Sequence, residues 1–330
     1  MMDLFYKKRS NESKLDLLEV IEYDGFNFNE KEYFKSAEDH ISSLTGHNHA
    51  KLTNSGNSAI LIAMNNLSGP IFIPDQGAWH GFKQIAKFLK KEIVSIKTNQ
   101  GLINLDDLED SFHKYSSIVS YSSGFFLTSF AGYTAEQDIK EIAKICDENE
   151  VTLVEDVSGG IGDDKKHLAN GRYSDIIVCS SGSPKIVNFG YGGFISSNDE
   201  NIFSNSKLLL NTFKVSPIIA RGIDTELNNA KKNFTKAVTA TRYLKKSFSN
   251  VIHHDKRGIN LIVSNDNPNY LFKILNEDLK TVEGKSILTK CPNYNRIKEK
   301  ALAIEIKNLD ANSLNKENLD EIINICENVF

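Results

Sequence analysis

The sequence is poor in cysteine and has no long apolar run. Its four cysteines are widely scattered, at Cys146, Cys179, Cys291 and Cys326. Because they form no CxxC pair, they indicate neither a disulfide framework nor a zinc site, and we expect no bound metal. No apolar run approaches the roughly 20 residues of a membrane-spanning helix, so we expect no membrane partner. The first nine residues lack the apolar core of a secretion signal, and we expect a cytoplasmic protein.

An excess of charge of either sign is also missing. Lys and Arg number 39 and Asp and Glu 43, which gives a formal net charge of −4. Proteins that bind nucleic acid neutralise phosphates with a basic surface, so we expect no nucleic-acid partner. Hydrophobic residues make up 40% of the 330 residues, enough for a sizeable core. A chain of this length is expected to form one large and one smaller domain.

Short apolar runs alternate with amphipathic stretches between about residues 52 and 200. The runs at 71–73, 93–96, 117–120, 152–154 and 176–178 are predicted strands. Between two of them, residues 135–149 carry apolar side chains at helix spacing. This alternation predicts an α/β fold with a mostly parallel sheet and helices on both faces. Ligands bind beyond the carboxyl ends of such strands, so the loops that follow the strands are expected to carry the site.

The chain outside this region has a different pattern. Residues 1–51 are polar and partly helical, and after about residue 205 the strict alternation ends. The predicted elements here are a helix at 30–45, a long lysine-rich helix at 226–248, strands at 260–263 and 303–306, and a helix at 316–329 capped by Asn315. We therefore expect a large α/β domain at 1–205 and a small C-terminal α+β domain at 206–330.

Three polar segments follow predicted strands, and the first is a turn into an apolar helix. It runs from Thr53 to Ser58, with Asn57 or Ser58 suited to start the helix. Backbone N–H groups at a helix N-terminus, together with the helix dipole, favour a phosphate. We therefore expect Gly56, Asn57 and Ser58 to bind a phosphate, with an ordinary helix cap as the alternative.

The second segment places an acid at the end of a strand. Asp156 ends the run that begins at residue 151, and Ser158, Gly159 and Gly160 follow it. A carboxylate there is suited to pair with a protonated ring nitrogen, whose pKa it would raise. A strand-end aspartate that caps the next turn is the alternative. Glu155 points to the other face of the strand, so we interpret it as structural.

The third segment carries hydroxyl groups and then a lysine. Ser180 and Ser181 follow the predicted strand at 176–178, Lys185 comes next, and a glycine turn at 190–193 leads into another strand. Ser180 is suited to bind a phosphate, and Lys185 to form a Schiff base with an aldehyde. A tight turn and a surface lysine are the alternatives for this segment taken alone.

Together the three segments resemble the DegT/DnrJ/StrS aminotransferases, a family of fold type I enzymes that use pyridoxal 5′-phosphate (PLP). The order of phosphate turn, strand-end aspartate, serine and lysine is the order of that fold type. The matching residues are Ser55, Gly56, Ala59, Ser180, Lys185 and the turn from Gly190 to Gly193. The resemblance covers about residues 40 to 200.

The resemblance implies transfer of an amino group from an amino acid such as glutamate to a keto sugar, typically nucleotide-linked, in polysaccharide or secondary-metabolite biosynthesis. It implies that Lys185 holds PLP and moves the proton, Asp156 keeps the ring nitrogen charged, and Ser180 anchors the phosphate. An aromatic residue covers the ring in this family, and Trp79, with His80 as the alternate, is expected there. A homodimer with the site at the subunit boundary is also implied.

Three positions depart from the family pattern. Gly159 stands where the family has Gln or His near the phenolic oxygen of PLP, and Ser158 is the candidate to compensate. Ser181 replaces an aromatic residue, and Pro184 is displaced by one position. A regulatory PLP-fold protein or a sugar dehydratase is therefore the alternative. The family's dehydratases carry histidine in place of the lysine, so Lys185 favours an aminotransferase.

No segment of the C-terminal third matches the family's substrate-binding loops. Arg296 and Arg221 are candidates for a donor carboxylate because the guanidinium fork matches it, with surface ion pairs as the alternative. The remaining histidines, among them His47 and His167, lack recognisable partners and are expected to be solvated.

Overall fold

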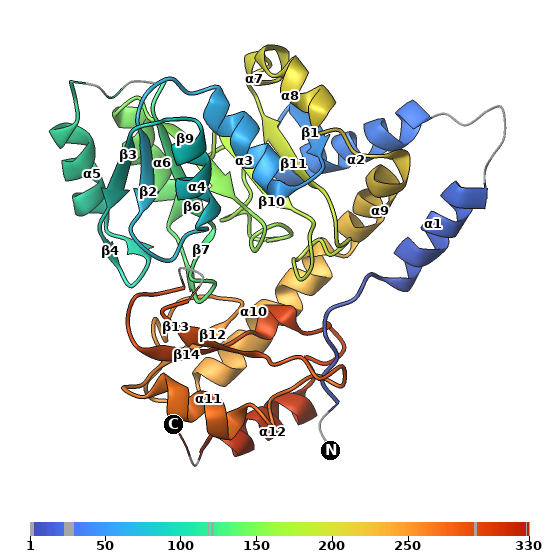
Figure 1. Cartoon of the computed structure of the whole chain (residues 1–330), viewed down its shortest axis with the longest axis vertical. Helices are drawn as coiled ribbons and strands as arrows, with labels where there is room; N and C mark the ends of the chain where they lie inside the picture. The colour runs from blue at the N-terminus through green and yellow to red at the C-terminus, as the bar shows by residue number, and fades with distance from the viewer. Residues whose placement is uncertain are drawn as a thin grey trace.

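The computed structural model describes residues 3–22, 30–117, 119, 122–293, 296–327 and 329. Two sheets organise the chain, the larger in the upper half of Figure 1 and the smaller in the lower half. The large sheet has seven strands in the order β1-β11-β10-β9-β6-β2-β3. These strands are β1 (His49–Thr53), β2 (Ile71–Pro74), β3 (Ile93–Ile96), β6 (Gly124–Thr128), β9 (Thr152–Asp156), β10 (Ile176–Ser180) and β11 (Gly193–Ser197).

The direction of the strands brings several loops to one edge of this sheet. Strands β10, β9, β6, β2 and β3 are parallel, so their carboxyl ends lie together. β11 runs antiparallel to both β10 and β1, so its first residue, Gly193, lies opposite Ser180 and opposite Thr53. The turn after β1 therefore reaches the same edge as the loops after β9 and β10.

Helices cover both faces of the large sheet, which explains the continuous apolar runs of its strands. In β10, Ile176 and Val178 join the core under α3 (Gly56–Asn65) and α4 (Gly81–Phe88). Ile177 and Cys179 point to the opposite core. In the upper half, the helices that contribute to that core include α2 (Glu30–Thr45), α5 (Leu105–Lys114), α6 (Ile139–Glu148) and α9 (Pro217–Asn228).

The lower half is built on an antiparallel sheet in the order β12-β14-β13. Its elements are α10 (Ala230–Lys245), β12 (Leu261–Ser264), α11 (Pro268–Leu275), β13 (Leu288–Cys291), β14 (Ala301–Ile304), the 3-10 turn η1 (Ile306–Asn308) and α12 (Lys316–Glu327). The start of the chain also lies here, because the Lys7 N–H donates to the Asn308 carbonyl at 2.8 Å.

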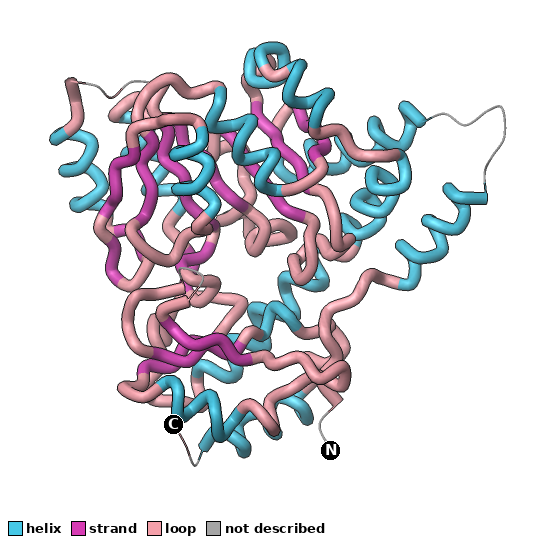
Figure 2. The backbone as a smooth tube through the Cα atoms, in the orientation of Figure 1, coloured by secondary structure: helices cyan, strands magenta, loops and turns pink. Residues whose placement is uncertain are grey.

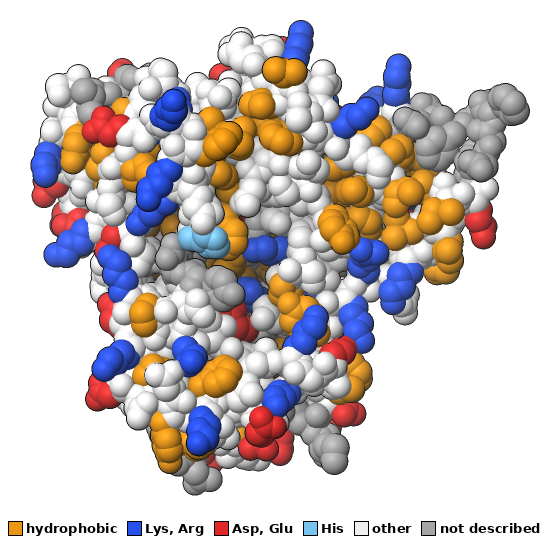
Figure 3. Space-filling model, in the orientation of Figure 1, with side chains coloured by type: hydrophobic (Ala, Val, Ile, Leu, Met, Phe, Trp, Pro, Cys, Tyr) orange, Lys and Arg blue, Asp and Glu red, His pale blue; other side chains and the backbone are white. Residues whose placement is uncertain are grey.

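The remaining elements are short or peripheral. They are α1 (Asn11–Glu22), α7 (Asn201–Asn205), α8 (Lys207–Thr212) and the strand pairs β4 (Thr98–Asn99) with β5 (Leu102–Ile103) and β7 (Phe130–Ala131) with β8 (Ala135–Glu136). The outer face of α1 exposes Leu15, Leu18 and Ile21, and Figure 3 shows apolar side chains gathered on this side of the molecule. In the described part of the chain, no helix combines the length and apolarity that a membrane crossing requires.

Most of the predicted elements are confirmed. The helix expected at 30–45 has those bounds, four of the five strands between 71 and 178 form, and the Asn315 side chain caps α12 by accepting from the Asn318 N–H at 2.9 Å. The strand expected at 303–306 begins and ends earlier, at 301–304. The helix expected within 135–149 is α6, which begins at Ile139. The first two residues of the predicted stretch form β8 instead.

Two predictions are wrong. At 117–120, Ser117 lies in a turn and Val119 outside any strand, while residues 118 and 120 fall outside the described residues. The strand of this region is β6, which begins at Gly124, after the predicted run. The single helix expected at 226–248 is divided between α9 and α10 at Asn229, which ends one helix and begins the next.

The break at Asn229 also bears on the division into domains. α9 packs against α1 and α2 beside the large sheet, whereas α10 packs against η1, β12 and α12 of the lower half. The chain thus leaves the upper half after α9. The boundary expected near residue 205 stays a prediction.

Lys245, on α10, ties the two halves together. Its side chain is buried, and Nζ donates hydrogen bonds to the carbonyl oxygens of Thr134 (2.7 Å), His253 (2.7 Å) and Lys256 (2.9 Å). Thr134 belongs to the hairpin of β7 and β8, which reaches from the large sheet toward the lower half (Figure 1). Burial lowers the pKa of Lys245 to about 8.

We expect Lys245→Met to lower the free energy of unfolding by about 3 kcal/mol, because three carbonyl oxygens lose their donor. The neighbouring Lys246 is exposed, so Lys246→Met is the matched control and should change stability by less than about 0.5 kcal/mol. Urea denaturation of both variants measures the difference. Equal stability of the two variants would show that the three bonds contribute nothing.

Candidate active site

The loops at the carboxyl edge of the large sheet face the lower half, and Figure 2 shows them gathered between the two sheets. Asp156 ends β9, Lys185 follows β10, and Trp79 lies between β2 and α4. Hydrogen bonds and short contacts connect these three segments to the start of α3. The structure therefore brings together the segments that the sequence pointed to.

The turn into α3 forms the first wall of the site. The helix begins at Gly56, one residue before the expected start, and Ser55 is its cap. The Ser55 hydroxyl oxygen accepts from the Ser58 N–H at 3.1 Å, and the Ser58 hydroxyl donates to Asn54 Oδ1 at 2.5 Å. Of the three expected phosphate-binding residues, Ser58 is thus already engaged within the turn, whereas Gly56 and Asn57 form the open end of the helix.

Ser180 lies against this helix end. A Cβ atom on Gly56 would lie 2.6 Å from the Ser180 Cβ, so only glycine allows the approach. The Ser180 N–H donates to the Ser158 hydroxyl at 2.8 Å, and the Ser180 hydroxyl accepts from the Gly182 N–H at 3.2 Å. A helix N-terminus with a serine beside it is suited to hold a phosphate.

Asp156 is buried and oriented by Ser158. Its Oδ1 atom accepts from the Ser158 N–H at 2.9 Å and from the Ser158 hydroxyl at 2.5 Å. No described residue hydrogen-bonds the second oxygen, Oδ2, which keeps its lone pairs for another donor. Glu155 points the other way, as expected, and accepts from Ser129 (2.7 Å) and Ser174 (2.8 Å), so it is part of the fold.

Lys185 lies in the interior of the site. Its Nζ donates to the Tyr133 hydroxyl at 3.0 Å and lies 5.7 Å from the centre of the Trp79 ring. Burial disfavours the charged amine, but Tyr133 and the carboxylate of Asp156 more than offset this, so the pKa of Lys185 is raised above its ordinary value. Lys185 is half-buried and hydrogen-bonded within the site, which differs from the fully exposed surface lysine that was the alternative from the sequence.

Trp79 and His80 occupy the side of the site next to α3. The Trp79 Nε1–H donates to Asn57 Oδ1 at 2.9 Å, which links the aromatic ring to the helix end. The His80 ring is centred 4.1 Å from the Trp79 ring, and His80 Nδ1 is buried without a partner among the described residues. Trp79, rather than His80, is the ring in contact with Lys185.

Tyr133 is the site residue that the sequence did not reveal. It lies between β7 and β8, and β7 is the element that follows β6. Its signal was the same as for the other three segments, a polar residue after a buried strand. Because the sequence did not predict β6, it did not identify the loop beyond this strand as part of the site.

The lower half contributes a buried cluster of charges. The Arg296 guanidinium donates from Nε and Nη2 to the two oxygens of Glu305, at 3.1 and 3.3 Å, and Lys307 Nζ lies 3.4 Å from Glu305 Oε2. The fork expected to bind a donor carboxylate is thus occupied by Glu305. The other candidate, Arg221, pairs with Asp16 at 3.3 Å.

Burial would raise the pKa of Glu305, but Arg296 and Lys307 lower it to about 2, so its carboxylate stays charged. Burial, together with the positive charge of Arg296, lowers the pKa of Lys307 to about 7 despite the attraction of Glu305. This cluster faces the same tyrosine as Lys185, because the Arg296 Cζ lies 4.6 Å and the Lys307 Nζ 4.9 Å from the Tyr133 ring centre.

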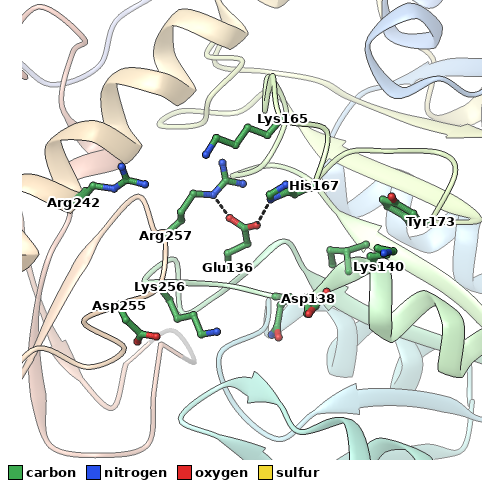
Figure 4. Close-up of a pocket in the computed structure, with 12 residues that line it drawn as sticks. Glu136, Asp138, Lys140, Lys165, His167, Tyr173, Arg242, Asp255, Lys256 and Arg257 are labelled. Carbon is green, nitrogen blue, oxygen red and sulfur yellow. Dashed lines mark hydrogen bonds and ion pairs between the residues drawn. The ribbon is translucent and has the colours of Figure 1, made fainter.

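A cavity of about 470 Å³ lies elsewhere, between α6 and the start of the lower half (Figure 4). Arg257 and His167 flank Glu136 there, and Arg257 also pairs with both oxygens of Asp163 at 3.0 Å. These pairs join the two halves of the chain. None of the residues that bind Asp156 or Lys185 lines this cavity, so we do not assign it to the site.

Two of the histidines expected to be solvated have partners. His47 is buried, its ring lies 2.9 Å from both the Ser196 hydroxyl and the Ser174 carbonyl, and burial lowers its pKa to about 4. His167 is exposed but contacts Glu136 at 3.2 Å. The prediction is therefore wrong for His47, whose polar partners, Ser196 of β11 and Ser174 just before β10, are distant in the sequence.

Comparison with protein-family models finds two matches. The model of the DegT/DnrJ/EryC1/StrS aminotransferase family matches residues 9–216, and that of the MJ1341 family C-terminal domain matches residues 231–327. The gap between the two stretches contains the break between α9 and α10. Comparison with curated proteins finds no match.

Solved structures share the whole fold at low sequence identity. PseC of Helicobacter pylori, an aminotransferase involved in the biosynthesis of pseudoaminic acid, is 15% identical with a TM-score of 0.74 and 99% of both chains covered. Spr1654 of Streptococcus pneumoniae, assigned as a sugar aminotransferase, is 11% identical with a TM-score of 0.72, covering 99% of this chain and 97% of that one. Serine palmitoyltransferase of Sphingomonas wittichii is 15% identical with a TM-score of 0.72, covering 97% of this chain and 83% of that one.

The charge cluster of the lower half leads to a test of stability. We expect Glu305→Gln to lower the free energy of unfolding at pH 7 by about 3–5 kcal/mol, because Arg296 and Lys307 lose their buried counter-charge. Since the folded pKa of Glu305 is about 2 and lies below the unfolded value, its contribution is full above about pH 4.5 and is lost as the pH falls toward 2.

Urea denaturation between pH 7 and pH 3 checks both statements, and the variant should lose less stability than the wild type on acidification. Glu277→Gln is the matched control, since Glu277 is 78% exposed and its ion pair is with Lys280 on the surface. If the two variants were equally stable at pH 7, the buried ion pairs of Glu305 would contribute nothing to the free energy of unfolding.

Proposed function

The chain belongs to the DegT/DnrJ/EryC1/StrS aminotransferase family and is a PLP-dependent aminotransferase of fold type I, and we propose that it moves an amino group from glutamate to a nucleotide-linked keto sugar. The observation that carries the proposal is the convergence of Lys185, Asp156 and the open end of α3 at one edge of the sheet. The resemblance to sugar aminotransferases supports the choice of acceptor.

The side chains of this edge fit PLP. The helix end at Gly56 and Asn57, with Ser180 against it, matches the phosphate, and a Cβ at position 56 would fill that space. Lys185 supplies an amine for the aldehyde. Asp156 has one oxygen held by Ser158 and the other without a partner among the described residues, which suits a protonated ring nitrogen.

When bound, PLP supplies an aldehyde that takes up the amino group and a cationic ring that accepts electrons from the reacting carbon. The chain provides the rest. Asp156 Oδ2 keeps the ring nitrogen protonated by placing a negative charge beside it. Lys185 Nζ takes the proton from one carbon and returns it to another, and the Trp79 ring shields this amine from water.

The proposal extends to the setting of the reaction. Amino sugars made on nucleotide carriers are building blocks of cell-surface polysaccharides and secondary metabolites, and we place the protein in such a biosynthetic route in the cytoplasm. The small half places Arg296 and Lys307 against Tyr133, across the site from the large sheet, and so bounds the space left for the acceptor.

The first test uses protein loaded with PLP. Reduction with borohydride and peptide mapping should find the pyridoxyl group on Lys185. Glutamate should bleach the visible absorbance of the loaded protein, and a nucleotide-linked keto sugar should restore it, with the aminated sugar detected by mass spectrometry. Lys185→Arg should lower the rate of transfer about 100-fold or more, because the proton carrier is gone.

Lys214→Arg, an exposed lysine, is the matched control and should behave as the wild type. A label on another lysine would refute the role of Lys185. A protein that holds PLP on Lys185 but responds to no amino donor would support the regulatory alternative instead.

We also propose a homodimer with the site near the subunit boundary. The outer face of α1 exposes Leu15 (66%), Leu18 (54%) and Ile21 (59%), a row of apolar side chains that a monomer leaves in water. Arg9, just before α1, donates to the Phe189 carbonyl in the loop after Lys185 at 2.5 Å. A partner that covered α1 would therefore lie close to the site.

Light scattering should give about twice the mass of the 37.0 kDa chain for the wild type. Leu18→Glu should shift the mass toward the monomer, because a charge cannot be buried unpaired in an apolar interface. Val282→Glu, at an equally exposed apolar residue of the lower half, should leave the dimer intact. A wild-type monomer at micromolar concentration would exclude the dimer.

A further inference from the structure

Close to Asp156 in the sequence, a residue without a side chain leaves a space, and the side chain of a residue distant in the sequence fills it. Gly159, three residues after Asp156, carries no side chain. A Cβ atom there would lie 3.1 Å from Cε1 of Tyr133 and 3.0 Å from Cδ1 of Ile259. The Tyr133 ring thus packs directly on the Gly159 backbone, and any larger residue at 159 would push the ring away.

The Tyr133 hydroxyl is the hydrogen-bond partner of the Lys185 amine, with Nζ at 3.0 Å. A phenol hydroxyl is both donor and acceptor. Its oxygen can accept a hydrogen bond from the charged amine and, after rotation, its O–H can donate one to the neutral amine. Among the described residues, Tyr133 is the one that hydrogen-bonds Nζ. The other titratable groups that act on Lys185 do so through their charge, and they are Asp156, Cys179, Arg296, Lys307 and Tyr6.

The surroundings hold Tyr133 in one place. Its φ is +65°, a left-handed conformation that a bulky residue adopts only when neighbouring contacts enforce it. The Tyr133 carbonyl accepts from the N–H groups of Ile259 (2.9 Å) and Asn260 (3.0 Å) in the lower half. Arg296 packs on the ring as a second anchor. The strained backbone therefore aims the hydroxyl at Lys185 and joins it to both halves.

We propose that Tyr133 is a positioning residue for Lys185. The Tyr133 ring occupies the space left by Gly159, and the Tyr133 hydroxyl holds Lys185 Nζ in place whether the amine is charged or neutral. The inference rests on the proposed role of Lys185. When Lys185 gives up a proton, the phenol keeps its own proton and reverses the direction of the hydrogen bond. The amine thus remains aimed at the reacting carbon throughout the transfer.

Tyr133→Phe removes the hydroxyl and keeps the ring. In protein without PLP, acetic anhydride at a series of pH values, followed by peptide mapping, measures the pH at which Lys185 becomes reactive. We expect this midpoint to move to lower pH in the variant, because the bond that favours the charged amine is gone. In protein with PLP, kcat should fall about 10- to 100-fold with little change in KM, as for loss of a hydrogen bond to a charged group.

Tyr173→Phe, a tyrosine that lines the cavity of Figure 4, is the control and should leave both readouts unchanged. The acetylation readout needs no cofactor, so it reports on Tyr133 and Lys185 even if another lysine carries PLP. An unchanged midpoint in Tyr133→Phe would overturn the inference while leaving the proposed function untouched.

A second pair of variants tests the packing on Gly159 and does not depend on the hydroxyl. Gly159→Ala should lower kcat about 10-fold by displacing the Tyr133 ring. In a Tyr133→Ala background, where the ring is absent, the same change should cost less than about twofold. Additive losses in this cycle would mean that position 159 acts independently of Tyr133 and would overturn the inference.

Discussion

The site depends on a contact between backbones at the edge of the large sheet. The start of α3, the end of β10 and the start of β11 approach so closely that a Cβ at Gly56 would lie 2.6 Å from Ser180 Cβ, and one at Gly193 would lie 2.4 Å from the Cys179 carbonyl oxygen. Glycine at both positions lets a helix end meet a strand end. The position of Ser180 beside the open end of α3, where we propose that the phosphate binds, follows from this contact.

The space between the two sheets is lined by charges that are paired on each of its two sides. Lys185 is balanced by Asp156 and held by Tyr133, and Glu305 is balanced by Arg296 and Lys307. Buried charges contribute little net stability, but the loss of one partner leaves the others unpaired. The contact between the two sides is the packing of Arg296 and Lys307 on the Tyr133 ring, next to Lys185.

The hairpin of β7 and β8 connects Lys185 to the lower half of the chain. Its tip residue, Tyr133, bonds Lys185, and the next residue, Thr134, is held by Lys245. Both residues contact the lower half through their backbone carbonyls. A shift of the lower half would therefore move the hydrogen-bond partner of the Lys185 amine.

The sequence by itself determined the α/β class, most strands of the large sheet, and the segments around Gly56, Asp156 and Lys185. These features are local, because strand periodicity, a polar turn before a helix and a lysine after a buried strand are all visible within about ten residues. The tertiary structure alone decided that Tyr133 fills the space of Gly159, that Glu305 occupies the Arg296 fork, and that His47 is buried. Each of these depends on residues far apart in the chain, and the packing that joins them leaves no periodic pattern in the sequence.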